Sequence, residues 1–144
     1  MSKKYFLAVL MVCVLMVVSV EIPTGAKAAI KEEGGITPFY IYTRAVSAGL
    51  NISSSGIATC TGSIRVYSTT SDISMRVNLY KKVGSSWIKE VGWTNSCEGR
   101  MSLSISETYT VTEGTYKVVT TAAIIAEDGN YETVSEESDI ITYP

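Results

Sequence analysis

Two short stretches of this 144-residue chain hold residue types that do chemistry in other proteins. The first contains Ser86 and Lys89, which have the S-x-x-K spacing of Ser–Lys acyl enzymes. Those enzymes place the pair on one face of a helix, whereas on a strand an odd separation sends the two side chains to opposite faces. The chain also has no histidine, which removes Ser–His and Cys–His nucleophilic sites and His-ligated metals. We therefore expect no catalytic site and a protein that is not an enzyme.

The second stretch gathers hard oxygen ligands between two apolar runs. Glu127, Asp128 and Asn130, with Glu132 close behind, offer the carboxylate and amide oxygens that Ca²⁺ prefers. Asp128-Gly129 is equally a hairpin turn, which needs no metal. We interpret the stretch as a turn and expect neither a metal nor another cofactor. No pattern in the chain marks a carboxylate pair of the kind that hydrolyses glycosides.

The N-terminus has the three parts of a secretory signal peptide. Lys3 and Lys4 precede an apolar run over residues 5–20, and an Ala-x-Ala end follows at residues 26–28. A membrane span requires about 20 apolar residues, and this run is shorter. We therefore predict cleavage after Ala28, a secreted protein, and no membrane span in the processed chain.

Cleavage makes the chain more acidic. It removes three of the 12 basic residues and one of the 14 acidic residues, so the formal charge changes from -2 to about -4. Such a chain lacks the basic footprint of a nucleic-acid-binding protein, and no nucleic-acid partner is expected. No Lys or Arg follows Lys117, although several acidic residues do. Either a solvated sheet face or an acidic binding surface accounts for this excess.

Two cysteines, Cys60 and Cys97, remain after cleavage. An even number of cysteines in an exported chain predicts a disulfide. This bridge would close a loop of 38 residues and stabilise the fold by about 4 kcal/mol. A pair of buried free thiols is the alternative.

Alternation of apolar and polar residues predicts β-strands. Over residues 73–80, one face carries Ile73, Met75, Val77 and Leu79. Similar alternation marks four further runs, and two more are less regular: residues 58–66, 87–93, 101–105 and 116–124, then 39–46 and 131–142. Ser and Thr are abundant, and they compete with a helical backbone for hydrogen bonds. Seven antiparallel strands with one apolar face each predict an all-β domain over residues 39–144, a β-sandwich. We expect residues 29–38 to be a flexible lead-in to this domain.

The sequence also predicts a hairpin, the faces of several side chains and a tyrosine corner. Gly84 lies in a connector short enough for a hairpin between the strands on either side. In the second of these strands, even spacings place Trp87, Val91 and Trp93 on one face. The same alternation places Cys60 on the core side of its own strand. Tyr116 lies in a segment similar to the tyrosine corner of immunoglobulin-like sandwiches.

Four segments carry a resemblance to a known family: Leu50–Gly62, Val77–Trp87, Leu103–Val111 and Gly114–Val118. Together with the leader, the chain resembles an uncharacterised family of small proteins secreted by Gram-positive bacteria, over residues 39–144. The resemblance implies a signal peptide followed by an immunoglobulin-like sandwich, and it implies no activity.

Four tyrosines form the candidate binding surface: Tyr40, Tyr42, Tyr67 and Tyr80. Outward-facing aromatic side chains can hold sugars or a protein partner, although cross-strand packing on a sheet explains them equally well. Our leading hypothesis is a secreted, noncatalytic binding or envelope-associated module whose partner is a protein or a cell-envelope glycan. The alternative is a secreted effector such as a bacteriocin-like toxin.

Overall fold

The computed structural model describes residues 40–67 and 72–144. The predicted signal peptide and lead-in lie outside the described residues. Within them the chain forms eight strands: β1 (Thr43–Ile52), β2 (Ile57–Val66), β3 (Asp72–Val83), β4 (Ser86–Glu98), β5 (Ser102–Thr110), β6 (Gly114–Ile125), β7 (Tyr131–Glu137) and β8 (Ile141–Tyr143). No helix in this part of the chain is long and apolar enough to cross a membrane.

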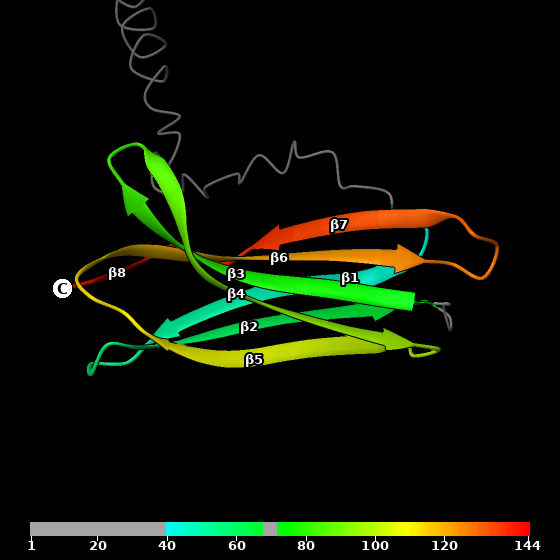
Figure 1. The fold of residues 1–144 in the computed structure, drawn as a ribbon, viewed down its shortest axis with the longest axis horizontal. Coiled ribbons are helices and arrows are strands. Elements are labelled where there is room, and N and C mark those ends of the chain that lie inside the picture. The colour runs from blue at the N-terminus through cyan, green and yellow to red at the C-terminus, as the bar shows by residue number, and fades with distance from the viewer. Residues whose placement is uncertain (1–39, 68–71) are drawn as a thin grey trace, which may run out of the picture. The chain divides into compact units, whose positions relative to one another are not determined.

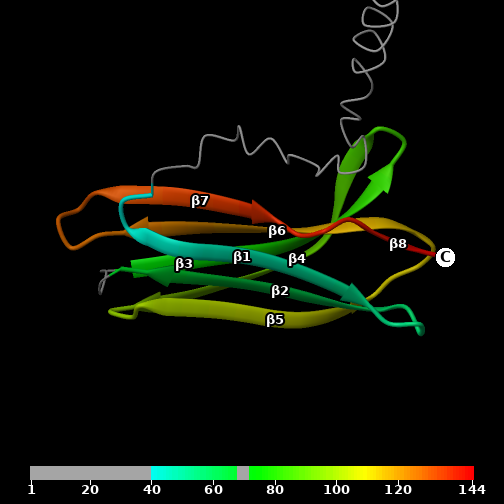
Figure 2. The ribbon, with the colours of Figure 1, turned by 180° about the vertical axis from the view of Figure 1, so that it is seen from behind.

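The strands form two antiparallel sheets packed face to face, which confirms the predicted all-β sandwich (Figures 1 and 2). One sheet has the order β1-β2-β5; the other has the order β4-β3-β6-β7, and β8 pairs with β6. The first, second and fifth strands thus face the third, fourth, sixth and seventh. This division is that of an immunoglobulin-like sandwich, with strands A, B and E against C′, C, F and G.

The strand count is eight because the predicted run 131–142 is broken in the middle. Ser138 donates its N–H to the Val118 carbonyl at 2.9 Å, and its side-chain oxygen accepts the Val118 N–H at 2.8 Å. One serine therefore occupies both backbone groups of Val118, and the ladder to β6 stops at Glu137 before resuming at Ile141. The first strand also differs from expectation, because it spans Thr43–Ile52 instead of residues 39–46.

The core lies between the two sheets and is built from the apolar faces that alternation predicted. Ile73, Val77 and Leu79 of β3 are fully buried, as are Ile64 of β2 and Ile124 of β6. Burial of apolar surface stabilises a sandwich by roughly 25 cal/mol per Å². Strands β2, β3 and β6 therefore carry most of the apolar packing.

A β-bulge changes the prediction for β4. Leu79 pairs with Val91, but the next residue, Tyr80, pairs with Lys89. The extra residue reverses the parity of the strand on the far side of the bulge. Val91 and Trp93 pack against the core as expected, whereas Trp87 lies beside the lysines of the outer sheet face. The prediction that all three share a face was wrong. In Figure 1 the end of the β3–β4 hairpin bends away from the sandwich.

The predicted tyrosine corner is confirmed. The Tyr116 side chain is 2 % exposed, and its hydroxyl donates to the Thr112 carbonyl oxygen at 2.7 Å. The bond ties the start of β6 to the loop that leaves β5, where the chain crosses between sheets. Lys81 covers the same ring, with its ammonium nitrogen 5.5 Å from the ring centroid.

The predicted Cys60–Cys97 disulfide is contradicted, because both cysteines are free. Cys60 is fully buried on β2, whereas the Cys97 thiol lies 4.0 Å from the Ser102 carbonyl oxygen. Ser102 pairs with Arg65, five residues along β2 from Cys60, which corresponds to ~16 Å of strand. Bridged cysteines have Cα atoms about 4.4–6.8 Å apart. Both thiols face the core, but at different levels of it.

The two thiols are expected to differ in reactivity. Desolvation by burial raises the pKa of the Cys60 thiol to about 11, and the thiolate is the reactive form. Iodoacetamide at pH 8 is therefore expected to modify Cys97, which is half-buried, and to spare Cys60 until the protein is unfolded. Peptide mass mapping of the native and urea-unfolded protein measures both sites. If neither thiol reacts in the native protein before reduction, but both react after it, the two cysteines form a disulfide after all.

Candidate ligand-binding groove

The structure separates the four tyrosines of the candidate binding surface. Tyr42 and Tyr67 are neighbours, because the Tyr67 N–H donates to the Tyr42 carbonyl oxygen at 3.0 Å. Tyr40, two residues from Tyr42, is half-buried and packs against the core. Tyr80 is on β3 of the other sheet, eight residues from the Asp72 end of that strand, or ~26 Å along it. The four side chains therefore do not make one platform.

The acidic stretch forms the hairpin turn between β6 and β7, as interpreted. The Ala126 N–H donates to the Asn130 carbonyl oxygen at 2.8 Å, and Gly129 has a φ of 82°, which favours glycine. Asp128 accepts the Asn130 N–H at 3.0 Å, the Asn130 amide at 2.8 Å and the Tyr42 hydroxyl at 3.3 Å. The backbone N–H and then the amide of Asn130 are the main causes of a lowered Asp128 pKa. Hydrogen bonds within the turn and from Tyr42 thus hold the Asp128 carboxylate in place.

Glu132 has a comparable structural role at the start of β1. Its carboxylate accepts the Ile41 N–H at 2.6 Å, the Thr43 N–H at 2.9 Å and the Thr43 hydroxyl at 2.6 Å. Desolvation raises its pKa, but the Thr43 hydroxyl and the backbone N–H donors together outweigh that effect, and the net pKa is lowered. Glu132 therefore fastens the beginning of β1 to β7.

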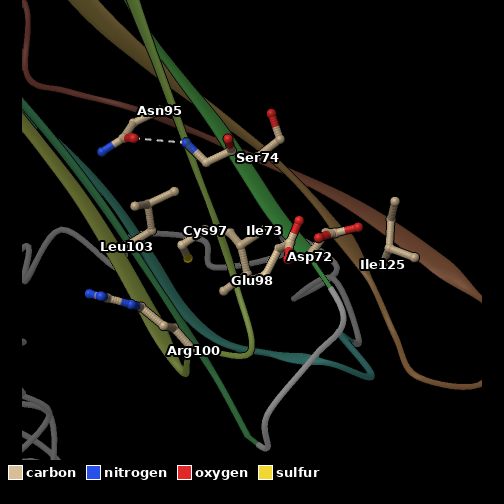
Figure 3. Close-up of a pocket in the computed structure, with 10 residues that line it drawn as sticks. Asp72, Ile73, Ser74, Asn95, Cys97, Glu98, Arg100, Leu103 and Ile125 are labelled. Atoms are coloured by element: carbon tan, nitrogen blue, oxygen red, sulfur yellow. Dashed lines mark hydrogen bonds between the residues drawn. The ribbon is translucent and has the colours of Figure 1, made fainter.

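A hollow of about 880 Å³ lies beside the ends of β3 and β4 (Figure 3). Asp72 and Glu98 are register partners there, and Arg100 and Cys97 also line it. A carboxylate pair in a groove is the arrangement that glycoside hydrolysis uses. Among the described residues, however, no hydrogen bond or ion pair holds either carboxylate in a fixed position.

A second groove, of about 400 Å³, runs along the outer face of the β4-β3-β6-β7 sheet. Its lining comes from three adjacent strands: Ser74, Arg76, Asn78 and Tyr80 of β3, Thr94 of β4, and Thr121 and Ala123 of β6. Arg76 pairs with Thr94 on one side and with Thr121 on the other, so the guanidinium is flanked by two hydroxyl residues. Of the predicted surface tyrosines, Tyr80 belongs to this groove. We call it the outer-face groove.

Asn78 has the most unusual environment in this groove. Its side chain is 8 % exposed, and its amide oxygen is buried with no hydrogen-bond partner among the described atoms. It pairs with Gly92, and a Cβ at Gly92 would collide with that oxygen and lie 3.2 Å from the Lys89 ammonium nitrogen. The missing side chain of Gly92 therefore makes room for both groups. Leaving a buried acceptor unpaired costs about 1–3 kcal/mol of free energy. A ligand that donates a hydrogen bond to this oxygen would recover that free energy on binding.

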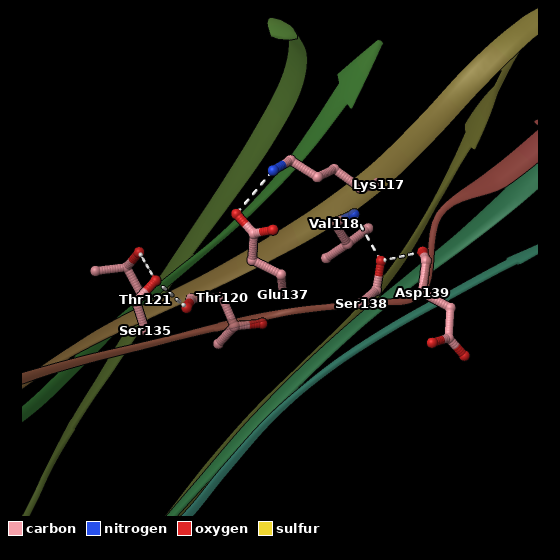
Figure 4. Close-up of polar contacts among 8 residues, drawn as sticks. All are labelled: Lys117, Val118, Thr120, Thr121, Ser135, Glu137, Ser138 and Asp139. Atoms are coloured by element: carbon pink, nitrogen blue, oxygen red, sulfur yellow. Dashed lines mark hydrogen bonds and ion pairs between the residues drawn. The ribbon is translucent and has the colours of Figure 1, made fainter. Parts of the chain in front are cut away.

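An aromatic and basic cluster lies at the end of the same sheet face. The Lys117 ammonium nitrogen is 4.8 Å and that of Lys82 is 6.0 Å from the centre of the Trp87 ring. Lys117 also forms an ion pair with Glu137 at 2.7 Å (Figure 4). Sequence reasoning missed this cluster because simple parity puts Trp87 in the core. The one available signal was Lys89, a charged residue interrupting an apolar face, where the structure has the bulge.

One hydroxyl pair and one hydroxyl–carbonyl bond link β6 and β7 on this face. The Thr121 and Ser135 hydroxyl oxygens are 3.3 Å apart, and the Ser135 hydroxyl donates to the Thr120 carbonyl oxygen at 3.1 Å (Figure 4). The wall of the groove on the β6 side is therefore held by a second strand.

Known proteins resemble the chain only distantly. No model of a known protein family matches it, and no curated protein matches it by sequence. A CARDB domain from Pyrococcus furiosus, solved in complex with two metal ions, matches with a TM-score of 0.36 and 12% identity, over 69% of this chain and 91% of that one. OgpA from Akkermansia muciniphila matches with a TM-score of 0.35 and 10% identity, over 74% of this chain and 32% of OgpA.

A third match is the sporulation control protein Spo0M of Bacillus subtilis, with a TM-score of 0.31 and 9% identity, over 67% of this chain and 48% of Spo0M. The matched region is about a third of OgpA and about half of Spo0M. These similarities assign no family.

Proposed function

We propose that the chain is a secreted, noncatalytic binding protein that holds a glycan of the cell envelope in the outer-face groove. The proposal depends on one observation: the buried amide oxygen of Asn78 has no hydrogen-bond partner within residues 40–67 and 72–144. Binding sites combine a few placed polar groups with aromatic surface, and this groove has hydroxyl residues, an amide and the ring of Tyr80. The leader sequence supports secretion, and the four resembling segments support a place among small secreted sandwich proteins of Gram-positive bacteria.

Chemical complementarity favours a glycan over a protein partner. Apart from Arg76 and Tyr80, the groove is lined by short and mostly polar side chains, whereas cores of protein interfaces are rich in large apolar and aromatic residues. Sugar hydroxyls both donate and accept hydrogen bonds, so they suit the hydroxyls of Ser74, Thr94 and Thr121 as well as the orphaned acceptor of Asn78. Tyr80 offers a ring against which a sugar face can stack.

Truncating the groove tyrosine tests the location. Tyr80→Ala is expected to weaken binding to an envelope glycan about tenfold, because stacking on an aromatic ring contributes about 0.5–1.5 kcal/mol beyond its buried area. Sedimentation with insoluble peptidoglycan sacculi, prepared with and without their attached anionic polymers, measures the effect. Tyr67→Ala is the matched control, because Tyr67 is 62% exposed and lies outside the groove.

Two outcomes contradict the proposal. Loss of binding in Tyr67→Ala with none in Tyr80→Ala would move the site to the Tyr42 end of the domain. No retention on sacculi or on soluble polysaccharides would remove the glycan-binding function. Killing of neighbouring strains by the purified protein would then favour the effector alternative.

A further inference from the structure

We infer that the glycan bound in the outer-face groove is acidic: a polymer whose repeat carries a carboxylate or a phosphate, bound by Arg76 and by the lysines around Trp87. This inference rests on the proposed function and narrows its ligand. It comes from the distribution of charge on the domain, which the proposed function does not use.

Four basic residues lie on the outer face of the β4-β3-β6-β7 sheet, although the whole chain has a formal charge of -2. The acidic register partners Asp72 and Glu98 lie on this face at the start of β3, the end farther from Lys82. Arg76 lines the groove, Lys89 lies over Gly92 at its side, and Lys82 and Lys117 contact Trp87 at its end. Among the described residues, Lys117–Glu137 is the only ion pair. Arg76, Lys82 and Lys89 therefore have no carboxylate partner in this part of the chain. Gathered cations without counter-ions attract an anionic ligand.

Arg76 has the geometry to select the anionic group. A guanidinium offers a rigid fork of N–H donors that matches the paired oxygens of a carboxylate or a phosphate. Thr94 and Thr121 lie on either side of Arg76 across the sheet, so hydroxyl donors flank the same spot. A neutral sugar would leave the guanidinium without a charged partner.

Lys89 and Asn78 lie side by side, so a ligand at this point has to interact with both. Both side chains occupy the space that the missing Gly92 side chain leaves, and in the part of the chain that the structure describes no donor reaches the Asn78 oxygen. An anionic group draws the flexible lysine ammonium towards itself, and an adjacent sugar hydroxyl can then donate to the uncovered amide. A ligand that carries an anion next to hydroxyls satisfies both residues, which is the chemistry of an acidic sugar or a polyol phosphate.

The separation of the cations implies a polymer. Arg76 and Lys82 are six residues apart on β3, or ~20 Å along an extended strand, and Trp87 pairs with Lys82. A single sugar cannot span that distance, whereas a chain of several sugars can contact Arg76 at one point and stack on Trp87 at another.

Titration calorimetry with three defined polymers tests the inference: polygalacturonate for carboxylate, poly(glycerol phosphate) for phosphate, and galactan as the neutral reference. At least one acidic polymer is expected to bind at least tenfold more tightly than galactan. Arg76→Gln is expected to weaken that binding about tenfold or more, because hydrogen bonds to charged groups are the strong ones. Raising the ionic strength is expected to weaken it further.

Arg65→Gln is the matched control, since it removes the same charge from an exposed arginine of the other sheet. Lys82→Gln is the second groove variant, with an expected two- to threefold loss, and thermal unfolding checks that each variant is folded. Equal loss in Arg65→Gln and Arg76→Gln would show unspecific charge attraction and overturn the inference. Galactan bound as tightly as the acidic polymers, with Arg76→Gln unaffected, would overturn the inference and leave the proposed function standing. Binding of none of the three polymers or of sacculi would overturn both.

Discussion

Replacing Gly62 with alanine is expected to lower the free energy of unfolding by about 1–3 kcal/mol. Gly62 lies on β2, where it faces the other sheet across the core. An ideal Cβ at this position would lie 2.5 Å from the Thr120 hydroxyl oxygen and 2.5 Å from a methyl carbon of Val77. Real Cβ atoms do not approach other atoms so closely, so a methyl group here forces the sheets apart or displaces both side chains.

The two contacting side chains have little room to move. Val77 and Thr120 are both 0% exposed, and β-branched side chains have few allowed χ1 rotamers. The Thr120 hydroxyl oxygen has no hydrogen-bond partner among the described atoms, so the expected cost of moving it is steric. Interiors are packed about as densely as organic crystals, and the strain of an added methyl group therefore spreads into β3 and β6.

Gly49→Ala is the matched control for this prediction. Gly49 is a strand glycine of the same sheet, and a Cβ there would meet only the side chain of Thr61. Thr61 is only half-buried, so it can turn to another χ1 rotamer at the cost of its 3.4 Å hydrogen bond to the Gly49 carbonyl oxygen. Its stability is expected to change by less than about 0.5 kcal/mol. Urea denaturation of the two variants and the unmodified protein measures the difference. A Gly62→Ala protein as stable as Gly49→Ala would show that the sheets do not approach each other closely at Gly62.

Alternation predicted the strands well because it reports a purely local property. A strand with one buried face must place apolar residues at every second position, as Ile73, Val77 and Leu79 do. The β-bulge in β4 is not local in the same way, because it depends on how β4 aligns with β3. A single extra residue reverses the parity between the two sides of the bulge, so Trp87, which precedes it, faces the opposite way from Val91 and Trp93.

The disulfide failed for a related reason. Parity correctly predicts that Cys60 faces the core, and Cys97 also faces it, but parity contains no information about position along the strand axis. That position follows from register, which places Cys97 next to Ser102, level with Arg65 of β2 and five residues from Cys60. An even cysteine count cannot supply this distance.

The outer-face groove was likewise beyond sequence reasoning. Arg76 and Asn78 occupy the polar positions of a predicted strand, and a polar face is the ordinary solvent side of a sheet. Cross-strand pairing aligns Arg76 with Thr94 and Thr121, and it sets Asn78 opposite Gly92. The four tyrosines were grouped by residue type, and only Tyr80 shares a surface with these residues.

Glu132→Ala is expected to destabilise the domain by about 2 kcal/mol at pH 7. The substitution removes the acceptor for the N–H and the hydroxyl of Thr43, a residue that is 2% exposed, and leaving buried donors unpaired costs about 1–3 kcal/mol. It also frees the Ile41 N–H. Glu136→Ala, an exposed glutamate of the same strand, is the control, and its stability should stay within about 0.5 kcal/mol of the unmodified protein.

The pH dependence of stability separates the carboxylate from a merely space-filling side chain. The pKa of Glu132 is lower in the folded protein than its ordinary value of 4.5, so between those two pKa values the unfolded chain binds more protons. Stability from this group is therefore complete above about pH 4.5 and is lost as the pH falls through the folded-state value. Urea unfolding between pH 7 and pH 3 should show a shallower acid decline for Glu132→Ala than for Glu136→Ala. Some decline should remain in both variants, because the pKa of Asp128 is also lowered. Identical pH profiles for the two variants would mean that Glu132 does not fasten β1 to β7 as an ionised carboxylate.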